Sequence, residues 1–235
     1  MPVRPVTDVV AAVPARHFML GLPPVAYRGL RGLCHVVNRA YFRVEVDGAD
    51  SVPATGAVIL APVHRSNIDF LVVSEVTRRK LFYMAKDSLW KSPRFGGFLE
   101  SIGAFPVHRQ GADRLALDRA QDVLERGEAL ILFPEGTRRS GPEVEELHEG
   151  AAFLAARTGA PIVPIGIGGS AEAMPKGAKM VHPVKIHVVV GQALAAPARS
   201  ERGRVPRTQV HALTERLRDE LQALYDEALR SAGRN

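Results

Sequence analysis

Residues 57–70 read AVILAPVHRSNIDF, an apolar run that passes directly into a polar turn. The run at 57–62 is short and continuous, which is typical of a strand that is buried on both faces. His64 and Asp69 follow the run and lie five positions apart. We therefore expect a buried strand that ends beside an imidazole and a carboxylate, with the next helix starting close by.

The same alternation of short apolar runs and helical periods continues along the chain. Strand candidates lie at 43–46, 57–62, 81–85, 104–107, 129–133, 162–167 and 184–190, and helix candidates at 68–79, 93–101, 112–126 and 150–158. A final helix is indicated by one apolar stripe, Val210, Leu213, Leu217, Leu221, Leu224 and Ala228. This pattern predicts an α/β fold, a mostly parallel central sheet flanked by helices.

Residues 1–43 differ from the rest of the chain. Pro23 and Pro24 divide them into two helical pieces, the second running from about residue 25 to residue 42. That piece has apolar residues at three- and four-residue spacing with arginines between them. Such a basic amphipathic helix suits a membrane interface, but equally a helix packed on the domain. We divide the chain into a membrane-associating helical segment, 1–43, and an α/β domain, 44–235.

The composition restricts the classes of partner. The chain has 235 residues, enough for one domain, and a net charge of +6 with a pI of about 9.8. A basic protein favours phosphorylated small molecules or an anionic lipid surface. Aromatic residues are only 6% of the chain, so stacking platforms for nucleic acid are few and no nucleic-acid partner is expected. No apolar run approaches the roughly 20 residues that span a bilayer.

His64 and Asp69 together form a candidate general base. A carboxylate that orients an imidazole prepares it to remove a proton from a hydroxyl. No Gly-x-Ser-x-Gly nucleophile elbow lies nearby, so the hydroxyl is expected to belong to a substrate rather than to an enzyme serine. This pair points to acyl transfer onto an alcohol.

Further polar groups follow other predicted strands, where ligands of parallel sheets gather. Arg109 and Arg138 offer planar guanidinium groups that suit a phosphate. Thr137 and the amide of Gly136 can donate hydrogen bonds to a polar headgroup. Glu135 can accept a hydrogen bond from a substrate hydroxyl or pair with an arginine. We therefore predict a phosphate-binding region beside the candidate base.

Four motifs in order resemble those of the glycerolipid acyltransferase family, in particular its bacterial 1-acylglycerol-3-phosphate (lysophosphatidic acid) acyltransferase branch. They are His64-x4-Asp69, GAFPVHR at 103–109, FPEGTR at 133–138 and VPI at 163–165. The resemblance covers about residues 44–191, and four ordered motifs are far more specific than one. This chain departs from many relatives in two places, because Val63 stands where they have asparagine and His148 where they have lysine.

The resemblance implies an enzyme that moves a fatty acyl group from an acyl thioester, acyl-CoA or acyl carrier protein, to lysophosphatidic acid. It implies no cofactor and no metal. His64 becomes the base and Asp69 its orienting partner, while Arg109, Glu135 and Gly136 bind the phosphorylated acceptor. The protein is expected at the cytoplasmic face of the cell membrane, as a peripheral or monotopic protein.

Three alternatives remain open on the sequence. The same chemistry could act on another acceptor, glycerol 3-phosphate or a glycolipid. A metal-dependent phosphohydrolase could use His64, Asp69, His108 and Glu135 as ligands. A non-catalytic lipid-binding module would need only the basic amphipathic start.

Overall fold

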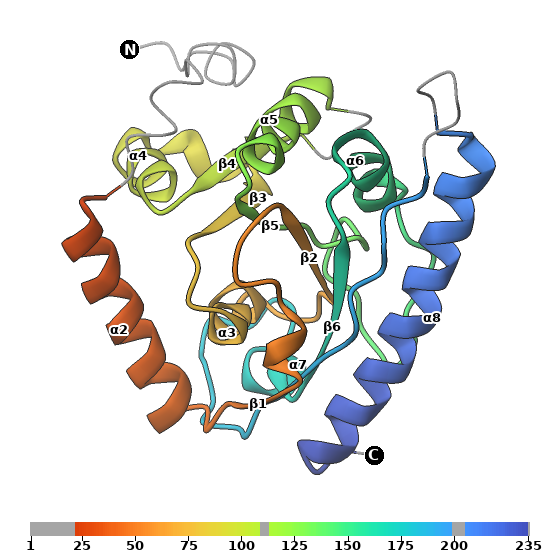
Figure 1. Ribbon diagram of the computed structural model, residues 1–235. Coiled ribbons are helices and arrows are strands. Elements are labelled where there is room, and N and C mark those ends of the chain that lie inside the picture. The colour runs from red at the N-terminus through yellow and green to blue at the C-terminus, as the bar shows by residue number, and fades with distance from the viewer. Residues whose placement is uncertain (1–21, 109–112, 199–204, 235) are drawn as a thin grey trace.

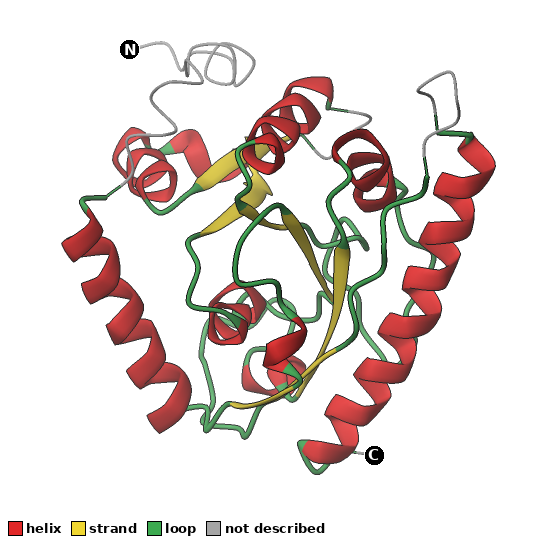
Figure 2. Ribbon diagram, in the orientation of Figure 1, coloured by secondary structure: helices red, strands yellow, loops and turns green. Residues whose placement is uncertain are grey.

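The computed structural model describes residues 22–108, 113–198 and 205–234. Within them, seven strands form one sheet against which helices pack (Figures 1 and 2). The strands are β1 Glu45–Asp47, β2 Val58–Pro62, β3 Leu81–Lys86, β4 Ala104–Val107, β5 Ala129–Ile131, β6 Ile162–Gly168 and β7 His187–Val190. Their order is β1-β7-β6-β2-β5-β3-β4. Every residue of β2, β5, β6 and β7 is buried, as continuous apolar runs predict.

Strand directions confirm the α/β fold with a mostly parallel sheet. The five strands from β6 to β4 are mutually parallel. Among the pairings between the described strands, that of β7 with β6 is the antiparallel one, and β1 runs parallel to β7. The carboxyl ends of β2 and β5 therefore lie side by side, with Leu60 level with Ile131. This neighbourhood brings the segments after residues 62 and 131 together.

Seven helices with α-helical geometry lie within the described residues. They are α2 Pro24–Ala40, α3 Asp69–Val73, α4 Pro93–Ser101, α5 Arg114–Glu125, α6 Gly150–Thr158, α7 Ser170–Ala173 and α8 Arg207–Ser231. Short 3₁₀ helices lie at η2 Ala49–Ser51, η3 Ser74–Val76 and η4 Asp87–Lys91. None of the helices in this described part of the chain is both long and apolar enough to cross a bilayer.

The prediction of one continuous helix over residues 68–79 is wrong in its second half. α3 ends at Val73, and the 3₁₀ turn η3 ends at Val76. The guanidinium of Arg31 in α2 donates to the carbonyls of Ser74 and Thr77, and Thr77 has an extended backbone. A contact from 43 residues away thus takes carbonyls that a longer helix would use internally.

The helix α2 packs on the domain by one face and exposes another. Asn38 donates to the carbonyl of Leu71 at 3.0 Å, and Arg31 donates to the carbonyl of Ser74 at 2.8 Å. On the opposite side Val25, Leu33 and Val36 are 80%, 61% and 59% exposed. The packed helix expected as one alternative is therefore present, and it still presents apolar side chains outward. The first expected helical piece lies outside the described residues.

The final helix α8 packs the predicted stripe against the core except for Leu224, which is half-buried, and Thr214 and Tyr225 join the buried face. It approaches β6 so closely that two glycines are required there. A Cβ on Gly166 would lie 2.2 Å from the carbonyl oxygen of Leu224, and one on Gly168 would lie 2.2 Å from that of Ala228. Both obstacles are backbone atoms, which cannot rotate away.

Substituting Gly166→Ala is expected to destabilise the protein by about 1–3 kcal/mol or more, because α8 must move off the sheet. Urea denaturation followed by circular dichroism measures the change in the free energy of unfolding. Gly29→Ala is the control, since a Cβ at this position meets nothing within 4 Å. Alanine is also favoured over glycine in a helix interior, so this variant should not lose stability. Equal stability of the two variants would contradict the close approach.

Candidate active site

The imidazole of His64 lies just beyond the carboxyl end of β2, with Asp69 at the start of α3. Its Nδ1 is 2.9 Å from Oδ2 of Asp69, and the carboxylate is completely buried. Because Asp69 accepts the Nδ1 proton, Nε2 carries the free lone pair. No described residue forms a hydrogen bond with Nε2. The geometry of a base and its orienting partner is therefore present.

The Asp69 carboxylate also holds the backbone of the turn. Oδ2 accepts hydrogen bonds from the amides of Arg65 and Ser66, each at 2.7 Å. Three donors on one oxygen fix both the carboxylate and the chain that carries the imidazole. The five-residue spacing thus closes a compact loop at the end of β2.

The segment after β5 also contacts His64, through its ring and its backbone. The ring of Phe133 stacks on the imidazole with centroids 4.1 Å apart, and the amide of Arg139 donates to the carbonyl of His64 at 2.9 Å. Oε1 of Glu135 accepts the His64 amide at 2.8 Å. The ring and both backbone groups of His64 are therefore held in place, and none of these contacts uses Nε2.

Glu135 is fully buried and forms an ion pair with Arg65, whose Nη1 lies 2.5 Å and 2.7 Å from its two oxygens. Of the two expectations for this residue, pairing with an arginine is confirmed. Its contact with an acceptor hydroxyl stays a prediction. Both carboxylate oxygens already accept hydrogen bonds from the protein. The amide of Gly136 likewise donates to the carbonyl of Phe133, at 3.0 Å, so its role towards a headgroup stays a prediction.

Of the other predicted binding residues, Thr137 and Arg138 lie on the same loop as Glu135 and Gly136. Thr137 is exposed and Arg138 is half-buried. Arg109 lies outside the described residues. His108, next to it, pairs with Asp87 at 2.6 Å. No cluster of three His, Cys, Asp or Glu side chains suited to a metal ion occurs in the described ranges, so the phosphohydrolase alternative gains no support from this geometry.

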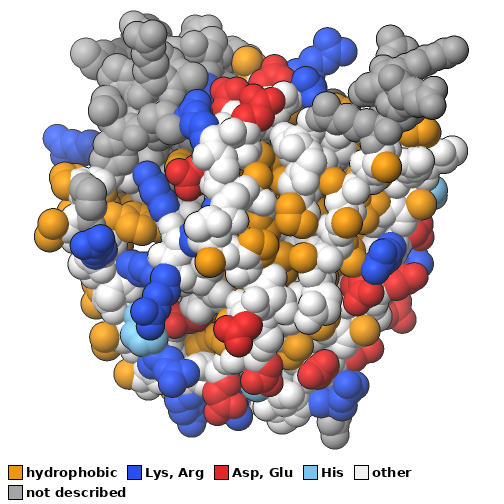
Figure 3. Space-filling model, viewed as in Figure 1, with side chains coloured by type: hydrophobic (Ala, Val, Ile, Leu, Met, Phe, Trp, Pro, Cys, Tyr) orange, Lys and Arg blue, Asp and Glu red, His pale blue; other side chains and the backbone are white. Residues whose placement is uncertain are grey.

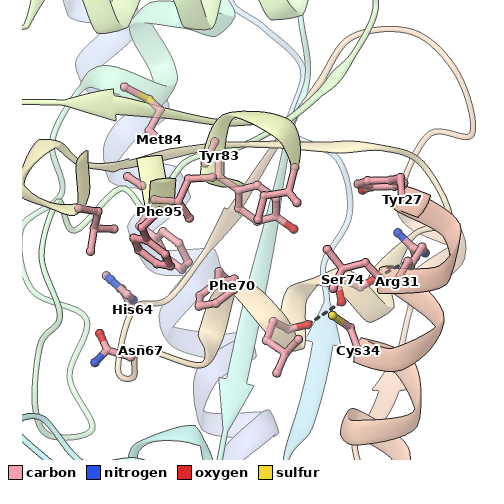
Figure 4. Close-up of a pocket in the computed structure, with 18 residues that line it drawn as sticks. Tyr27, Arg31, Cys34, His64, Asn67, Phe70, Ser74, Tyr83, Met84 and Phe95 are labelled. Carbon is pink, nitrogen blue, oxygen red and sulfur yellow. Dashed lines mark hydrogen bonds between the residues drawn. The ribbon is translucent and has the colours of Figure 1, made fainter. Parts of the chain in front are cut away.

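His64 also lines a cavity of about 400 Å³ (Figure 4). Its walls come mainly from α2, α3, β3 and α4 and include Leu30, Cys34, Phe70, Leu71, Met84, Phe95, Leu99 and Ile102. In Figure 4, His64 and Asn67 lie at one end, Phe70 and Tyr83 in the middle, and Tyr27, Arg31 and Cys34 at the α2 end. Burial raises the pKa of Tyr83 and of Cys34, so both side chains stay uncharged. The imidazole thus meets a largely apolar space.

Two residues of the site were missed by sequence reasoning. Arg65 and Tyr225 meet with the guanidinium carbon 4.7 Å from the ring centroid. An arginine next to a turn normally indicates a solvated side chain, and the tyrosine lies in a separate helix far along the chain. No local pattern in the sequence signals this contact.

Comparison with known proteins identifies the family. The family model described as Acyltransferase matches residues 43–168, more than half of the chain. The 1-acyl-sn-glycerol-3-phosphate acyltransferase of Bacillus subtilis is 29% identical over 152 residues, 64% of this chain and 73% of that protein. The protein of the same name from Pseudomonas aeruginosa is 29% identical over 174 residues, 69% of this chain and 63% of its own length. For a chloroplastic relative from Brassica napus, the match spans only 41% of the plant protein.

A solved structure shares the fold. The 1-acyl-sn-glycerophosphate acyltransferase of Thermotoga maritima superposes with a TM-score of 0.66 over 88% of this chain and 86% of that one, at 24% identity. The likeness extends beyond the part matched by the family model and confirms the sheet-and-helix arrangement. Because the family model covers more than half of its length, the chain belongs to the acyltransferase family.

Proposed function

We propose that this acyltransferase moves a fatty acyl group from an acyl thioester to the sn-2 hydroxyl of 1-acylglycerol 3-phosphate, forming phosphatidic acid in phospholipid biosynthesis. The observation that carries the proposal is the His64 imidazole, oriented by Asp69 and placed at one end of an apolar cavity. The names of the bacterial relatives support this acceptor over glycerol 3-phosphate or a glycolipid.

The reaction follows from the free lone pair on His64. Nε2 removes the proton of the acceptor hydroxyl while the hydroxyl oxygen attacks the thioester carbonyl carbon. The new C–O bond forms, the tetrahedral intermediate collapses with loss of the C–S bond, and the imidazolium returns the proton to the thiolate. Asp69 keeps Nδ1 protonated and stabilises the imidazolium charge between the two steps.

The apolar cavity is suited to the fatty chain. Its volume lies in the range of small-molecule sites, and its lining offers aliphatic and aromatic surface. An acyl chain there would place its carbonyl near His64 and its methyl end near α2. Because residues of α2 line that end of the cavity, they would limit the length of the chain in this arrangement.

We assign the phosphate of the acceptor to Arg138, Thr137 and Arg109. The first two lie on the loop that also carries Phe133, which stacks on the imidazole. A bidentate arginine would hold the phosphate while the neighbouring hydroxyl reaches Nε2. The donor thiol, on coenzyme A or acyl carrier protein, would leave from the same end of the cavity.

A lipid acceptor also requires contact with a membrane. Figure 3 shows apolar and basic side chains together on the side where α2 and α4 lie. Phe95 and Phe98 of α4 are 46% and 44% exposed, beside the exposed Lys91 and Arg94. We therefore place residues 1–43 and this face at the cytoplasmic surface of the cell membrane, with residues 44–235 as the acyltransferase domain. Apolar burial and attraction to anionic lipids would act together.

A direct assay tests the function. The full chain is mixed with an acyl-CoA and with anionic vesicles that contain 1-acylglycerol 3-phosphate, and free thiol and phosphatidic acid are both measured. We expect stoichiometric release of the two products and an activity that falls as salt screens the vesicle surface. Glycerol 3-phosphate and a glycolipid replace the acceptor in parallel arms. Product from one of these arms alone would overturn the proposed acceptor.

The cavity predicts a change in chain-length preference. Cys34→Trp adds a bulky ring at the α2 end and is expected to shift the preferred acyl-CoA towards shorter chains, with short substrates still used. The ratio of kcat/KM for a long and a short acyl-CoA measures the shift. Leu33→Trp is the control, since Leu33 points outward and is 61% exposed. An unchanged ratio in Cys34→Trp would place the acyl chain elsewhere.

A further inference from the structure

Arg65, the residue after the candidate base, carries its positive charge on a side chain that is almost fully buried. Its side chain is only 1% exposed. Nη1 contacts both oxygens of Glu135, and Nη2 donates to the carbonyl of Glu143 at 3.0 Å. Burying a guanidinium is costly unless its charge is paired, so this arrangement requires the segments that carry Arg65, Glu135 and Glu143 to be placed together.

Glu135 connects this buried charge to His64. The same Oε1 that accepts from Arg65 also accepts the backbone amide of His64. Asp69 fixes the imidazole through Nδ1, whereas Glu135 fixes the backbone from which the side chain extends. The position of Nε2 therefore depends on the carboxylate of Glu135, and that carboxylate is held by Arg65.

The helix α8 holds the other side of the guanidinium. The ring of Tyr225 covers it at 4.7 Å, a geometry that favours a cation. One turn earlier, Gln222 accepts from the amide of Val144 at 2.7 Å and donates to the carbonyl of Pro142 at 3.0 Å. The carbonyl of Glu143, which accepts from Arg65, lies between these two bonds. α8 lies outside residues 43–168, the part that the family model matches.

We propose that Arg65 is a positioning residue for His64 and that α8 extends the active site by holding Arg65 through Tyr225 and Gln222. The inference rests on the proposed role of His64 as the base. It implies that substitutions in α8 lower kcat without contact with either substrate, while KM changes little. A purely structural role for the same residues would change stability and leave kcat alone.

Two double variants separate positioning from stability. Arg65→Met/Glu135→Gln removes both charges but keeps an oxygen that can accept the His64 amide. Arg65→Met/Glu135→Leu also removes both charges and leaves that amide without its acceptor. Because neither variant buries an unpaired charge, both are expected to fold. The Gln variant should lose about tenfold in kcat, because the oxygen that accepts the His64 amide remains but Arg65 no longer holds it. The Leu variant should lose about 100-fold, as expected for a small displacement of a reacting group. Wild-type kcat in the Gln variant would overturn the role of Arg65. Equal kcat in the two folded variants would overturn the proposal.

A second pair of variants tests α8. Tyr225→Leu removes the ring and should lower kcat about tenfold, while Tyr225→Phe keeps the face over the guanidinium and should restore it. Leu217→Ala is the matched control, because Leu217 is buried on the same helix two turns away. It should lower the melting temperature with unchanged kcat. A loss of kcat in Leu217→Ala equal to that in Tyr225→Leu would show a general effect of stability and overturn the role of Tyr225.

A spectroscopic measurement keeps this inference distinguishable from the proposed function. Proton NMR follows the bridging proton between Nδ1 of His64 and Asp69, which is lost in His64→Ala and so can be assigned. Its resonance should shift in Tyr225→Leu and stay in place in Leu217→Ala. If the wild type were active and the resonance did not shift in either variant, the positioning inference would be refuted and the acyl-transfer function would stand. An inactive wild type with the expected shifts would refute the acyl-transfer function and leave the structural coupling intact.

Discussion

Replacing His64 by alanine is expected to lower kcat for acyl transfer by about 10²- to 10⁴-fold, the contribution typical of a positioned general base. The side chain has its Nδ1 bonded to Asp69 and its Nε2 free, so its loss removes the group that would take the hydroxyl proton. Thiol release from acyl-CoA, measured at saturating acceptor, gives the change in kcat.

Stability must be measured alongside. The imidazole stacks on Phe133, so some loss of packing is expected in His64→Ala while the fold persists. His211→Ala is the control, because its side chain is 67% exposed on α8. If folded His64→Ala released thiol as fast as this control, the assignment of the base would be refuted.

Substituting Asp69→Asn is expected to lower kcat by about 10³- to 10⁴-fold and also to destabilise the fold. The carboxylate accepts three hydrogen bonds on Oδ2, from the imidazole and from the amides of Arg65 and Ser66. An amide oxygen is a weaker acceptor than a carboxylate, and its NH₂ group cannot accept from these donors. The imidazole would lose its preferred tautomer and the turn would lose part of its support.

The two effects of Asp69→Asn can be measured separately. Thermal denaturation reports the loss of backbone support, about 1–3 kcal/mol for unsatisfied buried groups, and steady-state kinetics report kcat. Asp219→Asn is the control, since its side chain is 73% exposed on α8. A variant that lost stability but kept kcat would assign Asp69 to the fold alone.

Much of the fold could be predicted because strand signals are local. The apolar runs at 57–62 and 162–167 identify β2 and β6 almost to the residue. The expected strand at 129–133 ends early, at Ile131, and the one at 184–190 begins late, at His187. Boundaries depend on which partner strand is alongside, and the helix expected at 68–79 was shortened by Arg31 from another helix. Such contacts leave no periodic trace in the sequence.

The sequence by itself determined the α/β fold, the pairing of His64 with Asp69 and the resemblance to acyltransferases. Each of these features depends on residues that are close together in the sequence or on motifs of fixed spacing, so it can be predicted without knowledge of long-range contacts. Only the tertiary structure decided that Glu135 binds Arg65 and His64, that α2 lines the cavity beside His64, and that Tyr225 covers the buried guanidinium. The contacts of Arg65 with Glu135 and Tyr225 join residues 70 and 160 positions apart. Whether a charged side chain is solvated or buried therefore depends on what the rest of the chain places around it.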